Sequence, residues 1–392
     1  MTWKKVKLDI LCKMNSGGTP SRKNLSFYSG DIPWAKISDI EAAEGGIVLN
    51  TEEHITNSGL AAINNRIFES GTLLLAMYGS VGKVAFTGKK MSTNQAILGI
   101  NIKDVNILDY SYLKYWFQTI KSQLLDRAVG GTLQNISLGI VKELQIPLPP
   151  LSTQKRIAEI LDAADALRRK DHELLKKYDE LAQAIFIDMF GDPVKNEKGW
   201  DAKKLKDVCF KIADIDHKMP KEDENGMPFI SAKDLKDDGT ISFENVKKIS
   251  EEDFNRLSKK IKPELNDIIY SRIGAKLGKA RKVKTSISFI VSYSCCTIKP
   301  NKNLVNVDFL CYFLDSPFCL EEVWKKVRSI GVPDLGMDEV REIVIPIPPI
   351  KKQEEFCAAI NFLETSKDNL RQELSINLFN SLIQKAFNGE LL

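Results

Sequence analysis

Apolar residues recur at helical spacing in one long stretch after Pro150. Between residues 157 and 185 they follow one another at alternating steps of three and four, with one polar position in the series. This period of about 3.5 residues is typical of a long amphipathic helix with a single apolar seam. Residues 152–153 offer an N-cap hydroxyl, and Gly191 is placed to end the helix. The pattern predicts one rod-like helix whose seam needs a partner.

A second helical segment begins after Pro349, with a looser seam of the same kind. Each seam contains one charged residue, Asp171 in the first and Lys367 in the second. If the two helices pack antiparallel from equivalent starting points, Asp171 and Lys367 lie close together in an apolar interface. Such a buried pair can fix the register of two helices at some cost in stability. The expected seam residues are Ile157, Leu167, Asp171, Leu174, Tyr178 and Leu181 in the first helix, and Phe356, Leu363, Lys367, Leu370 and Leu374 in the second.

Short apolar runs separated by turn residues fill the chain ahead of each long helix. The runs at 72–78 and 287–291 predict strands, because they are short and rich in aliphatic and aromatic residues. Apolar residues recur at helical spacing at 110–127 and 307–327, which predicts shorter helices there. Each half of the chain therefore begins with a mixed region of strands and short helices.

The two halves share one plan, and ordered anchor motifs indicate an internal duplication. The sequence IPLPPL-x-x-Q at 146–154 recurs as IPIPPI-x-x-Q at 345–353. Further anchors keep the same order in both halves. They are Trp3, Leu8 and Cys12 in the first half, and Trp200, Leu205 and Cys209 in the second.

The distribution of charge says more than the net charge of +4, which is too small to identify a partner. Residues 70–103 and 268–307 contain lysines or arginines but no acidic residue, and they occupy equivalent places in the repeat. We interpret these windows as a polyanion-binding face. Lysines there would neutralise phosphates, and arginines or polar side chains would read base edges. The candidate DNA-binding residues are Ser16, Gly17, Gly18, Thr19, Lys36, Tyr78, Lys83, Lys89 and Lys90, with Arg272, Lys276, Lys279, Arg281 and Lys282.

The chemistry of a metal centre or an active site is missing from the sequence motifs. The seven cysteines form no C-x-x-C pair and the three histidines lie far apart, so we expect free thiols and no metal. GAKLGK at 274–279 has too few residues between its glycines for a phosphate-binding loop, and no serine or threonine follows its lysine. Nucleotide-binding, methyltransferase, nuclease and nucleophile-elbow motifs are absent as well. We therefore expect no catalytic residue in this chain.

Composition and hydropathy indicate a globular protein outside the membrane. The chain is 43% hydrophobic and 28% charged. Its apolar runs fall short of the ~20 residues that span a bilayer, and its first residues do not resemble a signal peptide. We expect a cytoplasmic protein that does not contact a membrane.

The order of the motifs resembles the specificity subunit of Type I restriction–modification systems. The resemblance rests on the two proline motifs before the helices, on SGGTPS at 16–21, on GDIPW at 30–34 and on GDP at 191–193. It implies an α+β fold with two homologous mixed α/β target-recognition domains. Two long helices separate these domains and form an antiparallel coiled coil, which gives a pseudo-twofold internal repeat. The implied parts are target-recognition domains at 1–150 and 191–350, and spacer helices at 151–190 and 351–392.

Such a subunit is a non-catalytic protein that binds DNA sequence-specifically. The implied partners are double-stranded DNA, two modification subunits that methylate adenine, and restriction subunits that translocate and cut DNA. S-adenosylmethionine, ATP and Mg²⁺ are then expected on the partner subunits, with no cofactor on this chain. Because the two mixed regions differ greatly in sequence, the DNA target is expected to be bipartite and asymmetric.

The second half departs from the resemblance in one place, and two alternatives stay open. GGTP at 17–20 has no counterpart after Cys209, so the same contact loop is not expected in both domains. One alternative is an enzyme that acts alone, such as a fused nuclease or methyltransferase. The other is a coiled-coil scaffold protein without a DNA role.

Overall fold

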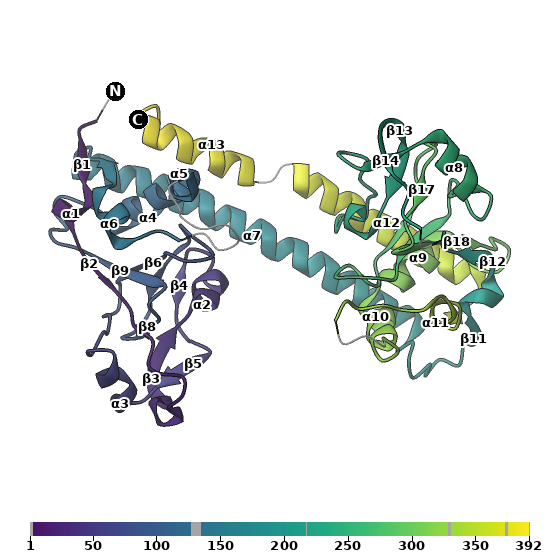
Figure 1. The fold of residues 1–392 in the computed structure, drawn as a ribbon, viewed down its shortest axis with the longest axis horizontal. Helices are drawn as coiled ribbons and strands as arrows, with labels where there is room; N and C mark the ends of the chain where they lie inside the picture. The colour runs from purple at the N-terminus through teal and green to yellow at the C-terminus, as the bar shows by residue number, and fades with distance from the viewer. Residues whose placement is uncertain (1–2, 127–134, 217, 328–330, 373–374, 392) are drawn as a thin grey trace. The chain divides into compact units, whose positions relative to one another are not determined.

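The computed structural model describes residues 3–126, 135–216, 218–327, 331–372 and 375–391, without the side chains of 371–376 (Figure 1). These residues form two compact units. Each unit combines a mixed α/β domain with segments of the long helices, and only unit 1 takes one of these segments from a distant part of the sequence. Unit 1 contains Met1–Leu174 and Gln372–Leu392, and unit 2 contains Leu175–Arg371.

The core of unit 1 is a five-stranded sheet of β2 (Cys12–Ser16), β9 (Ile97–Ile102), β6 (Leu73–Ala76), β7 (Val84–Thr87) and β4 (Ile47–Val48), in that order. Neighbouring strands are antiparallel, except that β7 and β4 are parallel. The strand predicted at 72–78 is confirmed as β6. All four of its residues are apolar and buried, as expected for a central strand covered on both faces.

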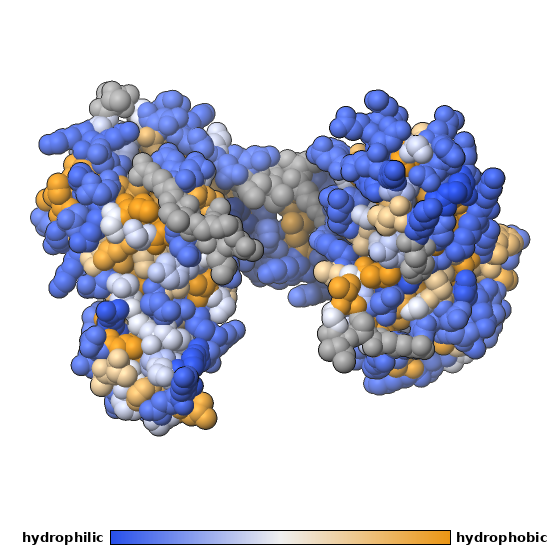
Figure 2. All heavy atoms as spheres, viewed as in Figure 1, coloured by the Kyte–Doolittle hydropathy of each residue, from blue (hydrophilic) through white to orange (hydrophobic). Residues whose placement is uncertain are grey.

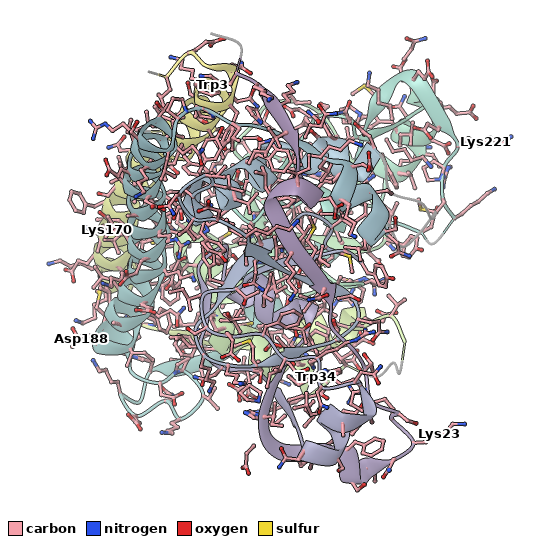
Figure 3. All side chains as sticks on the ribbon, turned by 90° about the vertical axis from the view of Figure 1, so that its left-hand side faces the viewer. Trp3, Lys23, Trp34, Lys170, Asp188 and Lys221 are labelled. Carbon is pink, nitrogen blue, oxygen red and sulfur yellow. The ribbon has the colours of Figure 1, made fainter. Side chains whose placement is uncertain are left out.

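A small lobe of unit 1 consists of β5 (Glu53–Ile55), β3 (Tyr28–Ala35) and β8 (Ser92–Thr93), with the 3-10 turn Leu25–Phe27 and α3 (Asn57–Ala62). Figure 1 shows this lobe at the end of unit 1 that lies away from the long helix. Trp34 is buried in it, and its Nε1 donates a hydrogen bond of 3.0 Å to the carbonyl of Gly18. Figure 3 shows Lys23 at the outer end of the lobe and Trp34 nearer to the rest of the unit. The buried indole thus ties the lobe to the end of β2.

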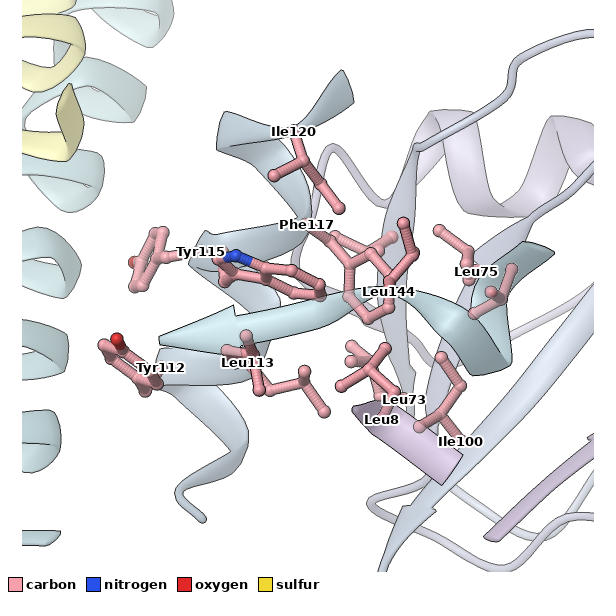
Figure 4. Packing of buried hydrophobic residues seen from close by; sticks show 14 of the residues in the cluster. Leu8, Leu73, Leu75, Ile100, Tyr112, Leu113, Tyr115, Phe117, Ile120 and Leu144 are labelled. Atoms are coloured by element: carbon pink, nitrogen blue, oxygen red, sulfur yellow. The ribbon is translucent and has the colours of Figure 1, made fainter. Parts of the chain in front are cut away.

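Helices pack on the sheet of unit 1 and complete its core. The helix predicted at 110–127 is confirmed, with a break at Ile120. Tyr112 and Tyr115 point from this region towards the long helix (Figure 4), where the Tyr115 hydroxyl donates to Asp162 at 2.5 Å. The remaining elements of unit 1 are β1 (Lys5–Lys7), α1 (Leu8–Leu11), α2 (Ile37–Ala42), α4 (Tyr110–Thr119), α5 (Lys121–Asp126), α6 (Leu138–Glu143), β10 (Gln145–Pro147), the first part of α7 (Leu151–Phe190) and α13 (Ser375–Asn388).

Unit 2 repeats the lobe of unit 1 and four strands of its main sheet, and no strand of the described residues in that sheet corresponds to β4. Its main sheet has the order β12-β18-β15-β16 and its lobe has the order β14-β13-β17, in which β13 is antiparallel to β14 and parallel to β17, as β3 is to β5 and β8. The strands are β11 (Asp201–Lys204), β12 (Cys209–Ala213), β13 (Glu222–Ile230), β14 (Lys247–Ile249), β15 (Ile268–Ser271), β16 (Ala280–Lys282), β17 (Ile290–Val291), β18 (Cys295–Pro300) and β19 (Val344–Ile347).

The helices of unit 2 also follow the sequence pattern. The helix predicted at 307–327 is confirmed as two helices, because Ser316 caps the second one just before Pro317. The strand expected at 287–291 is confirmed only in its last two residues, β17. The helical elements are the turns Leu205–Val208 and Ala232–Asp234, α8 (Glu251–Ser258), α9 (Val307–Asp315), α10 (Pro317–Trp324), α11 (Met337–Arg341), the second part of α7, and α12 (Ile350–Gln372).

The ends of α7 test the predicted helix signals. The helix ends at Phe190, and Gly191 follows with a φ of +77°, as predicted from its lack of a Cβ. The predicted N-cap at 152–153 is wrong, because the helix already begins at Leu151 and the amide of Gln154 bonds to the carbonyl of Pro150. The proline itself therefore precedes the first turn.

The predicted seam of α7 is only partly correct. Ile157 is buried as expected, but Leu167, Leu174 and Leu181 are 46%, 42% and 46% exposed. Apolar spacing alone could not locate the covered face, because that face includes the charged Asp165, held by Arg168 and Arg169, and lies beside the leucine stripe. Asp171 and Tyr178 are half-buried. The buried positions of α7 include Leu161, Ala164 and Asp165 in unit 1, and Ala182, Phe186 and Phe190 in unit 2.

Within unit 2, α12 and the second part of α7 pack antiparallel. The ring of Phe356 lies 5.4 Å from that of Phe190, and Lys367 Nζ lies 2.7 Å from Asp179 Oδ1. Lys367 is buried as expected, but its carboxylate partners are Asp179 and Glu364 rather than Asp171. The expected pairing of Asp171 with Lys367 is therefore wrong. Of the other seam predictions in the second helix, Phe356 and Leu363 are buried, Leu370 is half-buried, and Leu374 lies outside the described residues.

The repeated proline motif has the same role in both units. Gln154 is fully buried, where its side chain accepts from the amide of Asp109 and donates to the carbonyls of Ile107 and Pro149. Gln353 is also fully buried, and it accepts from the amide of Asn306 and donates to the carbonyl of Pro348. Each glutamine thus joins the start of a long helix to the segment that leads into α4 or α9.

None of the helices in the described ranges combines the length and the apolar character that a membrane span requires.

Candidate nucleic-acid interface

The glycines of the SGGT segment are closely packed within unit 1. Gly17 and Gly18 are buried, and a Cβ on either would collide with Thr93 or Ile63. Their carbonyls accept from Arg66 and Trp34. Their expected contact with DNA stays a prediction. Of the other two candidates in this segment, Ser16 is half-buried and Thr19 is exposed beside Gln95.

Three candidate lysines of unit 1 are already engaged by side chains of the same unit. Lys36 pairs with Glu52 at 2.8 Å and Glu53 at 3.0 Å, and its hydrogen bonds to these glutamates raise the pKa of Lys36. Lys90 pairs with Glu69 at 2.8 Å, and Lys89 donates to the Asn50 side chain at 3.2 Å. Tyr78 is 40% exposed, and its backbone forms a bridge to Asn135.

Two glycine–lysine turns occupy equivalent positions in the units. In unit 1, GSVGK at 79–83 follows β6, and Lys83 lies 3.0 Å from Glu41. Hydrogen bonds from Ser80 and then Lys83 lower the pKa of Glu41. The first and last glycines of each turn have φ between +67° and +92°, which only glycine adopts without strain.

The turn of unit 2 repeats this ion pair. GAKLGK at 274–279 follows β15, and Asp237 accepts from Lys276 at 2.7 Å and Lys279 at 3.2 Å. These two hydrogen bonds lower the pKa of Asp237. Each turn thus presents lysine ammonium groups that a carboxylate of the same unit already neutralises.

The two candidate arginines of unit 2 are buried. Arg272 is 3% exposed and bonds to Asp214 at 2.9 Å and Asp334 at 3.1 Å. Arg281 is 2% exposed and bonds to Asp315 at 2.8 Å. A buried guanidinium needs such carboxylate partners, because an unpaired charge is costly away from water. The expectation that these arginines lie on an exposed DNA-binding face is therefore corrected.

The two windows without acidic residues, 70–103 and 268–307, therefore lie beside acidic side chains in the folded protein. Lys282, the last candidate, pairs with Asp308 at 2.7 Å, just outside its own window. Among the described residues, carboxylates pair with each of the charged candidates except Lys89, whose partner is the Asn50 side chain. Opposite charges within about 4 Å cancel most of each other's field at a distance. A charge count along the sequence could not show these ion pairs. Figure 2 shows hydrophilic residues over much of the visible face of each unit.

A cleft in unit 1 contains polar residues that the charge count did not indicate. It has a volume of 740 Å³ and lies beside the end of β2. Only Ser16 of the earlier candidates belongs to it. The consecutive asparagines, a turn signal that precedes an arginine, were the one feature of the sequence that could have indicated it. The polar residues around the cleft include Lys13, Asn15, Ser16, Asn64, Asn65 and Arg66.

The described residues contain no group of three or more His, Cys, Asp or Glu side chains placed to hold a metal ion. The seven cysteines are free and buried or half-buried, as the sequence predicted. Burial raises the pKa of Cys12, Cys209 and Cys295 to about 12, so these thiols stay protonated at neutral pH.

Curated relatives match this chain over nearly its whole length. A type I restriction enzyme specificity subunit of Methanocaldococcus jannaschii, MjaIX, is 26% identical over 99% of this chain and 93% of its own length. The specificity subunit of the Escherichia coli enzyme EcoBI is 21% identical, over 100% of this chain and 86% of its own. Both alignments thus span nearly the whole of this chain and most of the relative.

Solved structures share the fold. The S subunit of a type I restriction-modification system from M. genitalium superposes with a TM-score of 0.54 at 17% identity, over 99% of this chain and 96% of that one. A chain from a study of the assembly and conformational transition of the type I R-M system gives 0.57 at 18% identity, over 100% and 98%. The family model for the type I restriction modification DNA specificity domain matches residues 1–177 and again 197–377. Two matches that together cover both mixed domains and most of the long helices place this chain in the type I restriction modification DNA specificity family.

Proposed function

We propose that this chain is the sequence-specific DNA-binding subunit of a type I restriction–modification complex. The observation that carries the proposal is the match of one DNA specificity domain to each half of the chain. The two copies share a strand topology but differ in the side chains that they expose. Each domain therefore reads its own half of a bipartite, asymmetric DNA target. A scaffold protein without a DNA role is not favoured, since it would not require two such domains.

The long helices form the spacer between the two DNA-recognition domains. We place α7 and the C-terminal helices in an antiparallel coiled coil, which relates the two halves by a pseudo-twofold axis. The antiparallel contacts of Phe356 with Phe190 and of Lys367 with Asp179 support this arrangement. A 40-residue helix such as α7 is about 60 Å long, enough to separate two DNA contacts by more than one helical turn.

The chemistry of the complex belongs to its other subunits. This chain directs two modification subunits, which methylate adenine with S-adenosylmethionine, and restriction subunits that use ATP and Mg²⁺. It contributes no catalytic residue and no cofactor of its own. The exposed leucines of α7 support a protein partner on this helix. Leu167 and Leu174 lie seven residues apart in unit 1 and Leu181 follows after another seven, a spacing that suits a partner helix.

Selection from a random duplex library tests the function directly. The full chain, alone and with its modification subunits, is incubated with the library, and bound DNA is sequenced after several rounds. We expect enrichment of one motif with two unlike half-sites separated by a fixed spacer. Enrichment of no motif under either condition would contradict the proposal. Transfer of labelled methyl groups by the purified chain alone would contradict its non-catalytic part.

A further inference from the structure

The cleft beside β2 holds several amide groups that have no partner in the unit. Asn15, Asn64 and Asn65 are exposed, and their side-chain amides make no hydrogen bond within the described residues. Asn101, deeper in the cleft, uses only its Oδ1, which accepts from Thr72 at 3.1 Å. An amide offers two donors and an acceptor in one plane. Three such groups around a 740 Å³ cleft therefore form a surface with unused hydrogen-bonding capacity on both the donor and the acceptor side.

The charge around the cleft suits a polyanion. Lys13 is exposed, and Arg66 donates to the carbonyl of Gly17 at 2.7 Å through one nitrogen of its guanidinium. The carboxylate of Glu69 also lines the cleft, but it already pairs with Lys90. The cleft thus combines two cationic side chains with neutral amides, the combination that lets a protein approach phosphates and read bases between them.

The backbone fixes two of the amides in place. Asn64 and Asn65 have φ of +57° and +54°, at the turn that follows α3. Their main-chain amides bond to the carbonyls of Ala61 and Leu60 at 3.0 Å each. Asn15 lies on β2, which is an edge strand of the main sheet. Rigid backbone on both sides of the cleft lowers the cost of holding the side chains ready for a ligand.

The same place in unit 2 carries different side chains. β12 pairs with β18 as β2 pairs with β9, and this register puts Ala213 where unit 1 has Asn15. The turn after α8 begins with Lys259 and Lys260, and neither of these residues has the positive φ of Asn64 and Asn65. Lys260 is bound to Asp214 at 3.2 Å. The two buried glutamines and the glycine–lysine turns are repeated, whereas the asparagine of β2 is not. A difference at equivalent positions is expected of residues that distinguish two half-sites.

We propose that the cleft of unit 1 reads an A·T base pair, and that the amide of Asn15, Asn64 or Asn65 contacts the adenine edge. Asparagine can bond to both N6 and N7 of adenine in the major groove, a pattern that no other base offers. Lys13 and Arg66 contact the flanking phosphates. The inference rests on the proposed function, and it assigns base-reading residues within one of the two domains.

Three single variants test the assignment in the full chain with its modification subunits. Asn64→Gly and Asn65→Gly remove the amides and keep a residue that tolerates positive φ. Asn15→Ala removes the amide from an extended strand. Asn245→Gly is the matched control, because Asn245 is an exposed asparagine of unit 2 with φ of +54°. Thermal unfolding and near-UV circular dichroism establish that each variant folds as the unchanged chain does.

The readout is the binding motif selected from a random duplex library. The unchanged chain is expected to select an A·T pair at one or two positions of one half-site. At least one of the cleft variants is expected to lose about tenfold or more of that preference there, since one bidentate contact gives discrimination of this order. The other half-site and the Asn245→Gly motif are expected to stay unchanged.

Three outcomes overturn the inference. In the first, the folded cleft variants all select the motif of the unchanged chain. In the second, they lose affinity equally for every sequence, which is the behaviour of phosphate contacts. In the third, the position that changes is a G·C pair in the original motif. In each of these cases the unchanged chain still selects a bipartite motif, so the proposed function stands. If the unchanged chain selects no motif, the proposed function fails first.

Discussion

Buried cationic side chains in this protein are paired with carboxylates, several of which come from distant parts of the sequence. Lys367 illustrates this, since it is 6% exposed among apolar residues of α12 and α7. Burial by itself lowers the pKa of Lys367, but its hydrogen bonds to Asp179 and Glu364 outweigh that effect and raise it. Asp179 remains 61% exposed, so the pair lies at the border between core and solvent. The two partners are therefore expected to respond differently to substitution.

Replacing Lys367 is expected to cost less stability than removing its partners. Lys367→Met leaves Asp179 in water and fills the same space with an apolar chain, so the free energy of unfolding should change by less than about 1 kcal/mol. The double variant Asp179→Ala with Glu364→Ala leaves a buried ammonium without a partner and should cost about 2 kcal/mol or more. Urea unfolding of the full chain measures both, and Glu180→Ala is the control at an exposed neighbouring carboxylate. Equal losses from both replacements would contradict the argument.

The candidate residues show how far residue-scale prediction reached. Lys83, Lys276 and Lys279 lie at turns, whose glycines are visible in the sequence. Arg272 and Arg281 were misplaced, because their partners Asp214, Asp334 and Asp315 lie outside the acid-free window and only folding brings them close. A charge pattern along the sequence cannot reveal neutralisation by distant residues.

At the scale of elements, the helix starts depend on one buried glutamine in each half. Gln154 satisfies three backbone groups and Gln353 satisfies two in the described structure. A buried backbone group without a partner costs about 1–3 kcal/mol. The glutamine therefore explains why a proline motif that lacks backbone donors is followed by a regular helix.

Gln154→Ala is expected to destabilise unit 1 by about 2–4 kcal/mol, because it leaves the amide of Asp109 and the carbonyls of Ile107 and Pro149 without their partner. Gln353→Ala should cost less, since it frees fewer groups. Thermal unfolding of the full chain gives both values. Gln145→Ala, at an exposed glutamine of β10, should change stability by less than about 0.5 kcal/mol. A loss at Gln145 as large as that at Gln154 would argue against the assigned hydrogen bonds.

Element prediction from the sequence succeeded where the signal was local. Gly191 ends α7, and the spacing at 110–127 and 307–327 gave helices that differ only by a break. The covered face of α7 was missed because two neighbouring stripes both carry apolar residues. Which stripe the chain itself covers depends on side chains such as Phe356 and Phe379, whose packing is a tertiary property.

For the whole molecule, the leucines that the chain leaves uncovered are expected to bind a partner subunit. Leu167→Glu together with Leu174→Glu should abolish co-purification with a modification subunit, because two charges would be buried in an apolar interface. The stability of the isolated chain should hardly change, since both leucines are more than two-fifths exposed. Glu173→Gln, on the same helix, is the control. Normal assembly of a folded double variant would show that the partner binds elsewhere.

The organisation of the whole molecule could be predicted from the sequence where the two halves repeat each other. The proline motifs identified two halves, and the strand orders of the two units agree with that duplication. The unequal cleft beside β2 was not predictable, because Asn15 and Asn64 lie far apart in the sequence and meet only when the lobe folds against the sheet. Motifs that both halves share can be found in a single sequence. The function of residues that differ between the halves can be inferred only from the folded structure.

Because unit 1 is built from two distant segments of the chain, it can finish folding only late in synthesis. Phe379, Ile383 and Ala386 of α13 are buried in the same core as Leu73 and Tyr112. Everything in unit 2 lies between these two segments in the sequence. During synthesis the mixed domain of unit 1 therefore emerges first but completes its core last. Its apolar face stays uncovered by α13 until all of unit 2 has been synthesised. Nascent chains released before residue 379 would carry a complete second domain and an open first one, and would be the species that chaperones and proteases meet.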